Sequence, residues 1–278
     1  MKARPHPAAD HGEETDAGGG NQSVAMSARL LGELAASGQP LGVTELARRL
    51  DESKARVFRH LSTMKQCGFV SQEPAGDRYQ LGWNLYRLGV AAADQFGLAR
   101  VAQRHMTRLR DDTQETTALA IPAGGDALVI ASVQSERQVA LSIKLGVVIA
   151  ANYSALGRVV LAFAPAPVQQ QVFARPMLAL TRQSITKPAL LRRRLRLIQK
   201  RHFEVAVNEN SHGIATLAAP VFDDADRICA SVAIVSSAMR IREPPDTELV
   251  AQVQACAAAI SAELNATAWT TWRQRHDA

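Results

Sequence analysis

Residues 44–81 read TELARRLDESKARVFRHLSTMKQCGFVSQEPAGDRYQL, and this stretch does most to decide the fold. Thr44 is a candidate N-cap, and Glu45 follows in the first turn, where the helix dipole favours an anion. Two short helices joined by a tight turn predict a helix-turn-helix, whose second helix enters the major groove of DNA. The evidence for the two helices is a pair of apolar stripes, separated by Asp51-Glu52-Ser53: Leu46, Ala47 and Leu50, then Val57, Leu61 and Met64.

The second of these helices is basic and contains no acid between Ser53 and Gln66, whereas a solvated helix normally mixes charges of both signs. Its N-terminal end is the part that usually meets base edges. Arginine there can bind guanine through two hydrogen bonds, which discriminate by about 1–3 kcal/mol. The alternative is a short amphipathic helix with a basic outer face. The predicted DNA-contacting residues are Thr44, Ser53, Lys54, Ala55, Arg56, Arg59 and Arg78.

A hairpin is predicted directly after the basic helix. Residues 69–72 and 78–81 are short strand-like runs, and Pro74-Ala75-Gly76-Asp77 between them is typical of a turn. Such a hairpin is a wing, and Arg78 near its tip is placed to reach a phosphate or the minor groove. Upstream, residues 23–36 predict a further helix, which Gly38-Gln39-Pro40 ends. The segment as a whole, residues 22–82, is therefore expected to be a winged helix-turn-helix domain.

Composition limits the class of protein. The chain has 278 residues, of which 47% are hydrophobic, so it is long enough for two domains with sizeable cores. Its net charge of +6 suits a polyanionic partner. The three cysteines stand alone, without CxxC or Cys/His spacing, which predicts reduced thiols in the cytoplasm and no metal site. No signal peptide and no apolar run long enough for a membrane span is found.

The rest of the chain predicts an α+β organisation. Residues 1–21, rich in Gly, Pro, Ala and acid, are expected to be a disordered tail. A helical linker is expected over residues 83–97, where Trp83, Leu85, Leu88 and Ala92 form an apolar stripe. Residues 98–267 are expected to form one α/β domain, followed by a C-terminal tail over 268–278. Its predicted elements are a helix from residue 98 to 109, strands over 117–123, 127–133, 139–143, 216–221 and 227–235, and helices over 155–164 and 245–266.

Seven strings, in this order and at this spacing, resemble the IclR family of bacterial transcriptional regulators over about residues 22–265. They are GQPLGVTELARRL, RVFRHLSTM, GFV, RYQLGWNLYRLG, ANYSALGRVVLAFAP, NENSHGIATLAAPVFD and ICASVAIVSSAMRI. The resemblance implies a linker helix that helps to form a dimer and a GAF-like effector-binding domain. It also implies that a homodimer or a dimer of dimers binds a palindromic operator in double-stranded DNA, and that a small molecule modulates this binding. Repression and activation both remain open.

The resemblance also implies an effector site. In relatives that bind small polar acids, backbone amides at a helix start hold the carboxylate, and here the matching positions are Ala155 and Leu156. Polar side chains that complete such sites in the family are replaced by Ala206, Thr216, Ala233 and Val235. Because a buried polar ligand group without a partner costs about 1–3 kcal/mol, we expect an apolar or aromatic carboxylate instead. The alternative is that these side chains fill the site and no ligand binds.

Two further features are not expected to be binding sites of their own. Residues 182–201 are rich in Arg and Lys, but an apolar stripe at Leu191, Leu195 and Ile198 predicts a helix with a solvated basic face rather than a second nucleic-acid site, although a contribution to DNA association stays open. His105 is expected to be an ordinary helix residue rather than a ligand.

Catalysis is not expected, because no GxSxG, HExxH or Walker motif is present. His202 and His212 flank Glu204 and Glu209, which are expected to be ordinary exposed polar residues. No cofactor is implied. The remaining alternative is a winged-helix module that shapes DNA or docks a protein and has no effector; steep salt dependence without sequence preference would indicate it.

Overall fold

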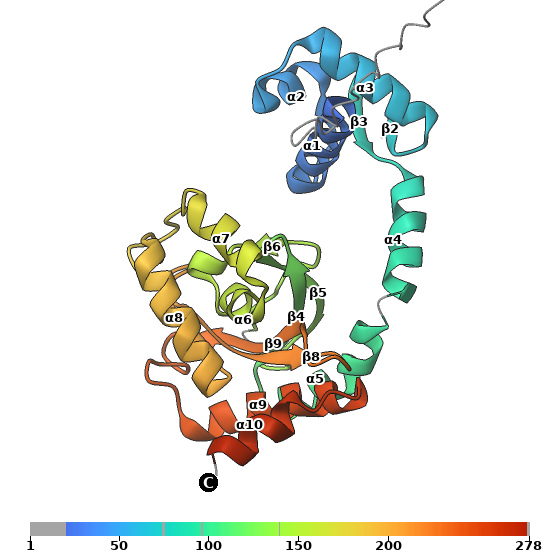
Figure 1. The fold of residues 1–278 in the computed structure, drawn as a ribbon. Helices are drawn as coiled ribbons and strands as arrows, with labels where there is room; N and C mark the ends of the chain where they lie inside the picture. The colour runs from blue at the N-terminus through green and yellow to red at the C-terminus, as the bar shows by residue number, and fades with distance from the viewer. Residues whose placement is uncertain (1–20, 74–75, 96, 139, 277–278) are drawn as a thin grey trace, which may run out of the picture. The chain divides into compact units, whose positions relative to one another are not determined.

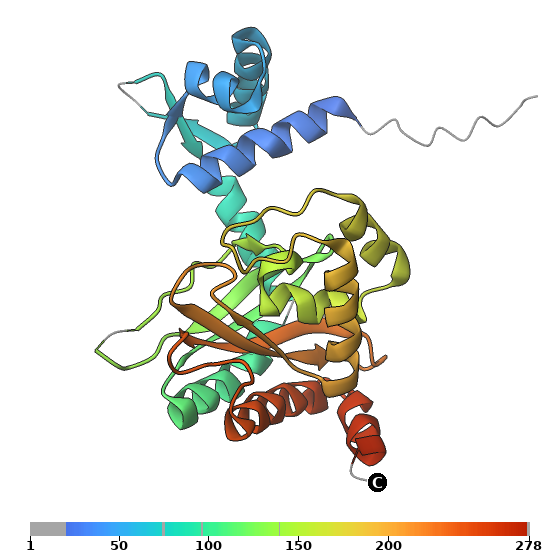
Figure 2. The same cartoon turned by 90° about the vertical axis from the view of Figure 1, so that its left-hand side faces the viewer.

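The computed structural model describes residues 21–73, 76–95, 97–138 and 140–276, so residues 1–20 of the predicted tail and the turn residues Pro74 and Ala75 lie outside it. Asn21, the last residue of the predicted tail, is instead the N-cap of the first helix. The chain divides into two compact units, one on each side of the boundary between Gln95 and Phe96. Each unit has its own buried core. The α+β organisation predicted from the sequence is confirmed (Figures 1 and 2).

The N-terminal unit combines three helices, a small sheet and a following helix. Its elements are α1 (Gln22–Ser37), β1 (Leu41–Gly42), α2 (Val43–Leu50), α3 (Lys54–Gln66), β2 (Val70–Gln72), β3 (Arg78–Leu81) and α4 (Trp83–Gln95). The sheet is antiparallel, with β3 between β1 and β2. β1 was not foreseen, because two residues are too short to give a pattern. Both predicted apolar stripes are buried in one core together with Met26, Leu30, Leu34, Val70 and Tyr79.

The C-terminal unit is built on one six-stranded antiparallel sheet in the order β6-β5-β4-β9-β8-β7. Its strands are β4 (Thr116–Ala123), β5 (Asp126–Val133), β6 (Val148–Ile149), β7 (Glu204–Val207), β8 (Ile214–Phe222) and β9 (Ile228–Ser237). Its helices are α5 (Leu98–Thr113), the short 3₁₀ helix η1 (Ala151–Tyr153), α6 (Ala155–Phe163), α7 (Ala166–Ala174), α8 (Pro188–Arg201), α9 (Thr247–Glu263) and α10 (Ala268–His276).

Helices cover both faces of this sheet (Figure 1). Side chains alternate along each strand. On β9, Val232 and Ile234 therefore join the core beneath α5 and α9, whereas Ala233 joins the core beneath α6 and α8. Ala118, Ala218 and Ala233 are register neighbours on three adjacent strands. Their small side chains leave room for α6 to lie close to the sheet, which fixes the start of this helix against the strands.

Two predictions for this unit need correction. The strand expected over residues 139–143 does not form: Ala140 to Ile143 carry no strand, and Val139 lies outside the described residues. The backbone there is held instead by the hydroxyl of Thr116, which donates a 2.8 Å hydrogen bond to the carbonyl oxygen of Leu141. The C-terminal tail expected from residue 268 is helix α10 as far as His276, and Trp269 in it is buried.

Candidate functional site

The first candidate site is the outer surface of the helix-turn-helix. The predicted N-cap at Thr44 is wrong: α2 begins at Val43 and its N-cap is Gly42, which makes no side-chain capping bond. The physical reason is that Gly42 is still paired with Arg78 in the sheet, so the chain passes directly from strand to helix. At the other end, Asp51 adopts a left-handed conformation and turns the chain toward α3.

The recognition-helix candidate, α3, presents a basic exposed face. Ser53 caps it by accepting a 3.3 Å hydrogen bond from the amide of Arg56, so its predicted place at the helix start is correct. Lys54, Ala55 and Arg59 are exposed. Neither Lys54 nor Arg59 makes an ion pair within the described residues. Arg56 differs, because its guanidinium lies 2.9 Å from a carboxylate oxygen of Glu52. Free cations and one paired arginine therefore share this face.

Arg78 does not stand alone at the tip of the hairpin. It is exposed on β3, beside β1, and its guanidinium donates a 3.2 Å hydrogen bond to the carbonyl oxygen of Pro40. This bond ties the hairpin to the segment before α2. The geometry keeps Arg78 on the surface, and its side chain retains further donors for an anion.

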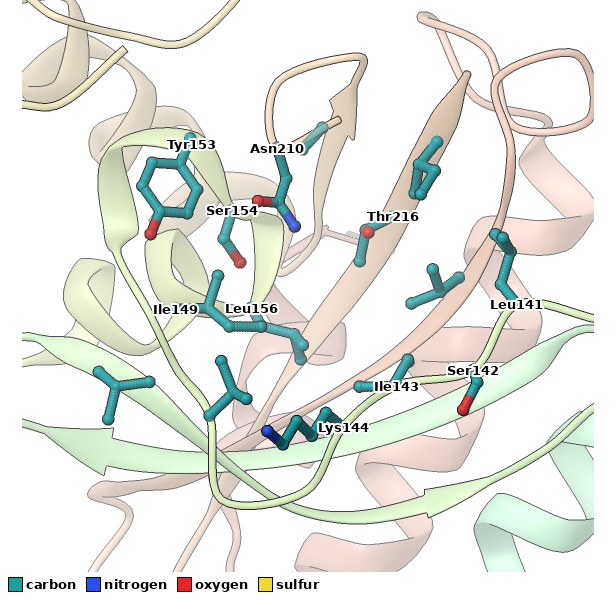
Figure 3. A pocket seen from close by; sticks show the side chains of 15 residues that line it. Leu141, Ser142, Ile143, Lys144, Ile149, Tyr153, Ser154, Leu156, Asn210 and Thr216 are labelled. Atoms are coloured by element: carbon teal, nitrogen blue, oxygen red, sulfur yellow. The ribbon is translucent and has the colours of Figure 1, made fainter. Parts of the chain in front are cut away.

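The second candidate site is a cavity of about 260 Å³ in the C-terminal unit, with a mainly apolar lining (Figure 3). The loop that carries Leu141 and Lys144 forms one side. Tyr153, Ser154 and Asn210 lie across from this loop. The strands β7, β8 and β9 supply Ala206, Thr216 and Val235, which are direct register neighbours: Ala206 opposes Thr216, and Thr216 opposes Val235.

Four of the six residues assigned to the effector site line this cavity: Leu156, Ala206, Thr216 and Val235. Ala155 and Ala233 do not line it. The side chain of Ala155 is buried in the core beneath α6, and Ala233 lies on β9 against that same helix. The sequence did not single out Lys144, Tyr153 or Asn210 as lining residues. Lys144 follows directly on the segment that was wrongly expected to be a strand.

The start of α6 borders the cavity and keeps amide groups available. Ala155 and Leu156 occupy its first turn, where backbone N–H groups have no acceptor one turn back. Ser154 satisfies only the third amide, accepting a 3.3 Å hydrogen bond from Gly157. A side chain at position 157 would meet Cα of Ala151 at 2.8 Å, so glycine is needed for the helix to pass η1 this closely. The amides are thereby held in place beside Leu156, which lines the cavity.

A buried ionic network lies behind this site, and it corrects a prediction. Glu204 and Glu209 were expected to be ordinary exposed residues, but both are buried. The guanidinium of fully buried Arg158 donates 2.7 Å hydrogen bonds to Glu204 and to both carboxylate oxygens of Glu209. Burial lowers the pKa of Arg158, but the attraction of Glu204 and Glu209 outweighs it and holds that pKa above its usual value.

Helix α8 takes part in the same network. Leu191, Leu195 and Ile198 are buried as predicted, but the basic face is not wholly solvated. Arg194 donates a 2.7 Å hydrogen bond to Glu204 and lies 2.6 Å from Glu243, and Arg201 lies 2.5 Å from Glu204. Burial lowers the pKa of Arg194, but the attraction of Glu204 and Glu243 outweighs this effect and holds that pKa above its usual value. Part of the basic run is therefore structural.

Comparison with known families decides the identity of the fold. Residues 23–74 match the model of the IclR helix-turn-helix domain, and residues 90–262 match the model of the bacterial transcriptional regulator IclR C-terminal domain. The chain belongs to the IclR family. As in that family, the N-terminal unit is a DNA-binding helix-turn-helix and the C-terminal unit is an effector-binding domain. It is a transcriptional regulator, not an enzyme.

Curated relatives agree in length as well as in sequence. The glycerol operon regulatory protein of Streptomyces griseus is 31% identical over 250 residues, covering 88% of this chain and 97% of that protein. The transcriptional repressor IclR of Escherichia coli is 26% identical over 235 residues, covering 84% of this chain and 86% of that protein. The IclR match therefore extends through both units.

Solved structures show the same IclR fold. A putative IclR regulator from Silicibacter sp. TM1040 superposes with a TM-score of 0.79 at 21% identity, covering 87% of this chain and 96% of that one. The IclR regulator from Alicyclobacillus acidocaldarius gives a TM-score of 0.75 at 25% identity, covering 91% and 100%. An IclR homologue from Microbacterium hydrocarbonoxydans, solved with 4-hydroxybenzoate, gives 0.72 at 20% identity, covering 87% and 98%.

Two further findings concern the part of the chain that the structure describes. None of its helices is both long enough and apolar enough to cross a membrane. Within the same residues, no three His, Cys, Asp or Glu side chains gather in a way that would hold a metal ion.

Proposed function

We propose that this regulator binds a palindromic operator sequence-specifically as a homodimer or a dimer of dimers, and that a small apolar or aromatic carboxylate modulates this binding. The observation that carries the effector part is the cavity bounded by Leu141, Leu156, Ala206 and Val235 beside the free amides of α6. The lining also carries polar side chains, among them Lys144, Asn210 and Thr216, but a polar acid of glyoxylate size would leave its apolar wall uncovered. An aromatic ring would instead find apolar neighbours.

The carboxylate has two candidate partners at the cavity. The amides of Ala155 and Leu156 suit an anion because they carry the positive end of the helix dipole. Lys144 is exposed at the rim and makes no ion pair among the residues described. Thr216 adds a hydroxyl, which suits a ring that bears a polar substituent. The 4-hydroxybenzoate bound by the Microbacterium homologue belongs to this chemical class, which supports the choice.

The homodimer part rests on α4. On this helix Trp83 is 71% exposed and Tyr86 is 78% exposed, and Leu88 and Val90 are also exposed. A helix with this many large apolar side chains on its surface is an interaction surface rather than a solvated connector. A second copy of the same helix would cover the patch through an isologous interface, and two recognition helices would then read two half-sites of a palindrome.

The first experiment measures binding to the DNA directly upstream of the gene by fluorescence anisotropy, against a shuffled fragment at the same salt concentration. A preference of about a hundredfold, or about 2.7 kcal/mol, is expected for a sequence-specific regulator. Equal binding to both fragments, with steep salt dependence, would favour the alternative of a DNA-shaping module without sequence preference.

The second experiment titrates the protein with benzoate, 4-hydroxybenzoate, hexanoate and glyoxylate by calorimetry, and then repeats the DNA assay with each. We expect the two aromatic acids to bind more tightly than glyoxylate. Lys144→Gln and Thr216→Val should each weaken aromatic binding, whereas Lys187→Gln, which changes an exposed lysine outside the cavity lining, should not. Folded protein that binds none of the four acids would contradict the effector proposal.

A further inference from the structure

A second cavity, also about 260 Å³, lies beside the first and differs from it in chemistry. Its lining includes Glu115, Arg137 and Arg240, whose side chains are charged, and the hydroxyl residue Ser236. The volume equals that of about nine water molecules, which is room for a small organic molecule. Neither the helix-turn-helix nor the apolar cavity uses these residues.

Positive charges outnumber negative ones among the side chains of Glu115, Arg137 and Arg240 in this second cavity. Glu115 is only 8% exposed, and it faces two guanidinium groups: Nε of Arg240 lies 2.5 Å away and Nη2 of Arg137 lies 4.0 Å away. Both ion pairs involve Oε1 of Glu115, and this oxygen accepts no hydrogen bond of favourable geometry from the described residues. Two partly exposed cations therefore face one buried carboxylate, which leaves an excess positive charge for an anionic group.

Ser236 provides a further polar group. It is 3% exposed and lines the cavity. The surrounding backbone is fixed: Thr116 accepts a 3.1 Å hydrogen bond from the amide of Ser135, and Ser135 accepts a 3.2 Å bond from the amide of Arg137. The hydroxyls of Thr116 and Ser135 thus hold the site in shape, and Ser236 and the Glu115 ion pairs lie at its lining.

We propose that this second cavity binds a small carboxylate that also carries a hydrogen-bond donor, namely a hydroxy or amino acid. Its carboxylate pairs with the guanidinium groups of Arg240 and Arg137, which match a carboxylate through parallel N–H donors. Its hydroxyl or ammonium group donates to Glu115. Ser236 completes the set, because a hydroxyl both donates and accepts.

The two cavities share a wall, since Leu141 and Val235 line both. A ligand in the second cavity therefore contacts side chains that the effector of the first cavity also contacts. Occupation of one site changes the affinity of the other, and linkage requires the effect to be reciprocal. This coupling rests on the effector function proposed above, whereas binding in the second cavity does not.

The test titrates the whole protein by calorimetry with D-glycerate, L-serine and propionate. Propionate is the matched probe, because it carries the carboxylate without the donor. Glycerate or serine should bind about tenfold more tightly than propionate. Arg240→Gln and Ser236→Ala should each weaken that binding, Arg240→Gln by about tenfold. Arg242→Gln is the control, because Arg242 lies two residues away and does not line the cavity.

Each outcome decides for or against the site. Wild-type protein that binds neither glycerate nor serine at concentrations on the order of 10 mM overturns the proposal. Equal binding of propionate, or unchanged binding in a folded Arg240→Gln variant, overturns it too. Benzoate titrations of the same variants keep the two proposals apart: benzoate binding to Arg240→Gln should persist, and its absence from all variants would count against the first cavity alone.

Discussion

The guanidinium of Arg158 and the carboxylate of Glu209 form a bidentate ion pair, joined by two hydrogen bonds of 2.7 Å. The pair spans 51 residues of sequence and connects α6 to the turn after β7. Glu209 precedes Asn210, which lines the apolar cavity, while Arg158 follows the helix start that borders it. The ion pair therefore sets the distance between two sides of the cavity.

Breaking this pair should be costly. Arg158→Met should lower the free energy of unfolding by about 3–5 kcal/mol, because it leaves Glu204 and Glu209 buried without their common partner. Chemical denaturation followed by circular dichroism measures the change. Arg193→Met is the matched control: Arg193 lies exposed on α8, and its replacement should cost little. A similar loss in both variants would refute a special role for the buried network.

The helix-turn-helix could be predicted because its information is local. Val57, Leu61 and Met64 repeat at helical spacing, and each is buried as that spacing requires. The strands of the wing follow from alternating residues on either side of a turn. The cap was misassigned because Thr44 has the right side chain for an N-cap, while pairing between Gly42 and Arg78 decides where α2 begins.

The buried network could not be predicted for the opposite reason. Nothing near Glu204 or Glu209 in the sequence marks them as buried, since their partner Arg158 stands on another element. The same holds for the loop after β5. Its apolar residues alternate as in a strand, but the hydroxyl of Thr116 donates a hydrogen bond to the carbonyl oxygen of Leu141, and the loop lines a cavity instead. Long-range partners, not local pattern, decide both cases.

Arg56 and Arg78 should affect DNA binding differently. Arg56→Ala should weaken binding mainly to the cognate operator, by about 1–3 kcal/mol, because the N-terminal end of a recognition helix meets base edges. Arg78→Ala should weaken binding more evenly across sequences. Anisotropy with operator and random DNA at fixed salt measures both, with Arg227→Ala in the other unit as control. Equal losses on both DNAs for Arg56→Ala would remove this residue from base readout.

Glu52 should limit the free charge on the same helix. Its carboxylate lies 2.9 Å from the guanidinium of Arg56 and 3.4 Å from that of Arg29, so Glu52→Gln leaves both cations without this counter-charge, Arg56 being the one on the recognition helix. We expect tighter binding to random DNA and a steeper dependence on salt, because one more cation competes with counterions at the phosphates. Arg56→Ala in the Glu52→Gln background should reverse most of this gain. A salt titration in which wild type and Glu52→Gln show the same dependence of affinity on salt would contradict the expectation.

The cysteines should differ in reactivity. Burial raises the pKa of the Cys229 thiol, and separately that of the Cys256 thiol, to about 12, so neither forms appreciable thiolate at pH 8. Cys67 is exposed. Ellman's reagent should therefore modify one thiol rapidly in the native protein and the rest only after unfolding, and Cys67→Ser should abolish the rapid phase. Rapid modification that survives in Cys67→Ser would show that a buried thiol is accessible.

Helix α10 should contribute measurably to stability. Trp269 is 4% exposed, and its indole N–H donates a 3.0 Å hydrogen bond to the carbonyl oxygen of Pro220 on β8. Trp269→Ala removes a large buried side chain and leaves that buried carbonyl without its donor, so it should lower the free energy of unfolding by about 3–5 kcal/mol. Trp269→Phe restores the ring without the donor, and should recover most but not all of the loss. Urea denaturation monitored by circular dichroism compares the three proteins. If wild type and Trp269→Ala unfolded at the same urea concentration, α10 would not be part of the folded core.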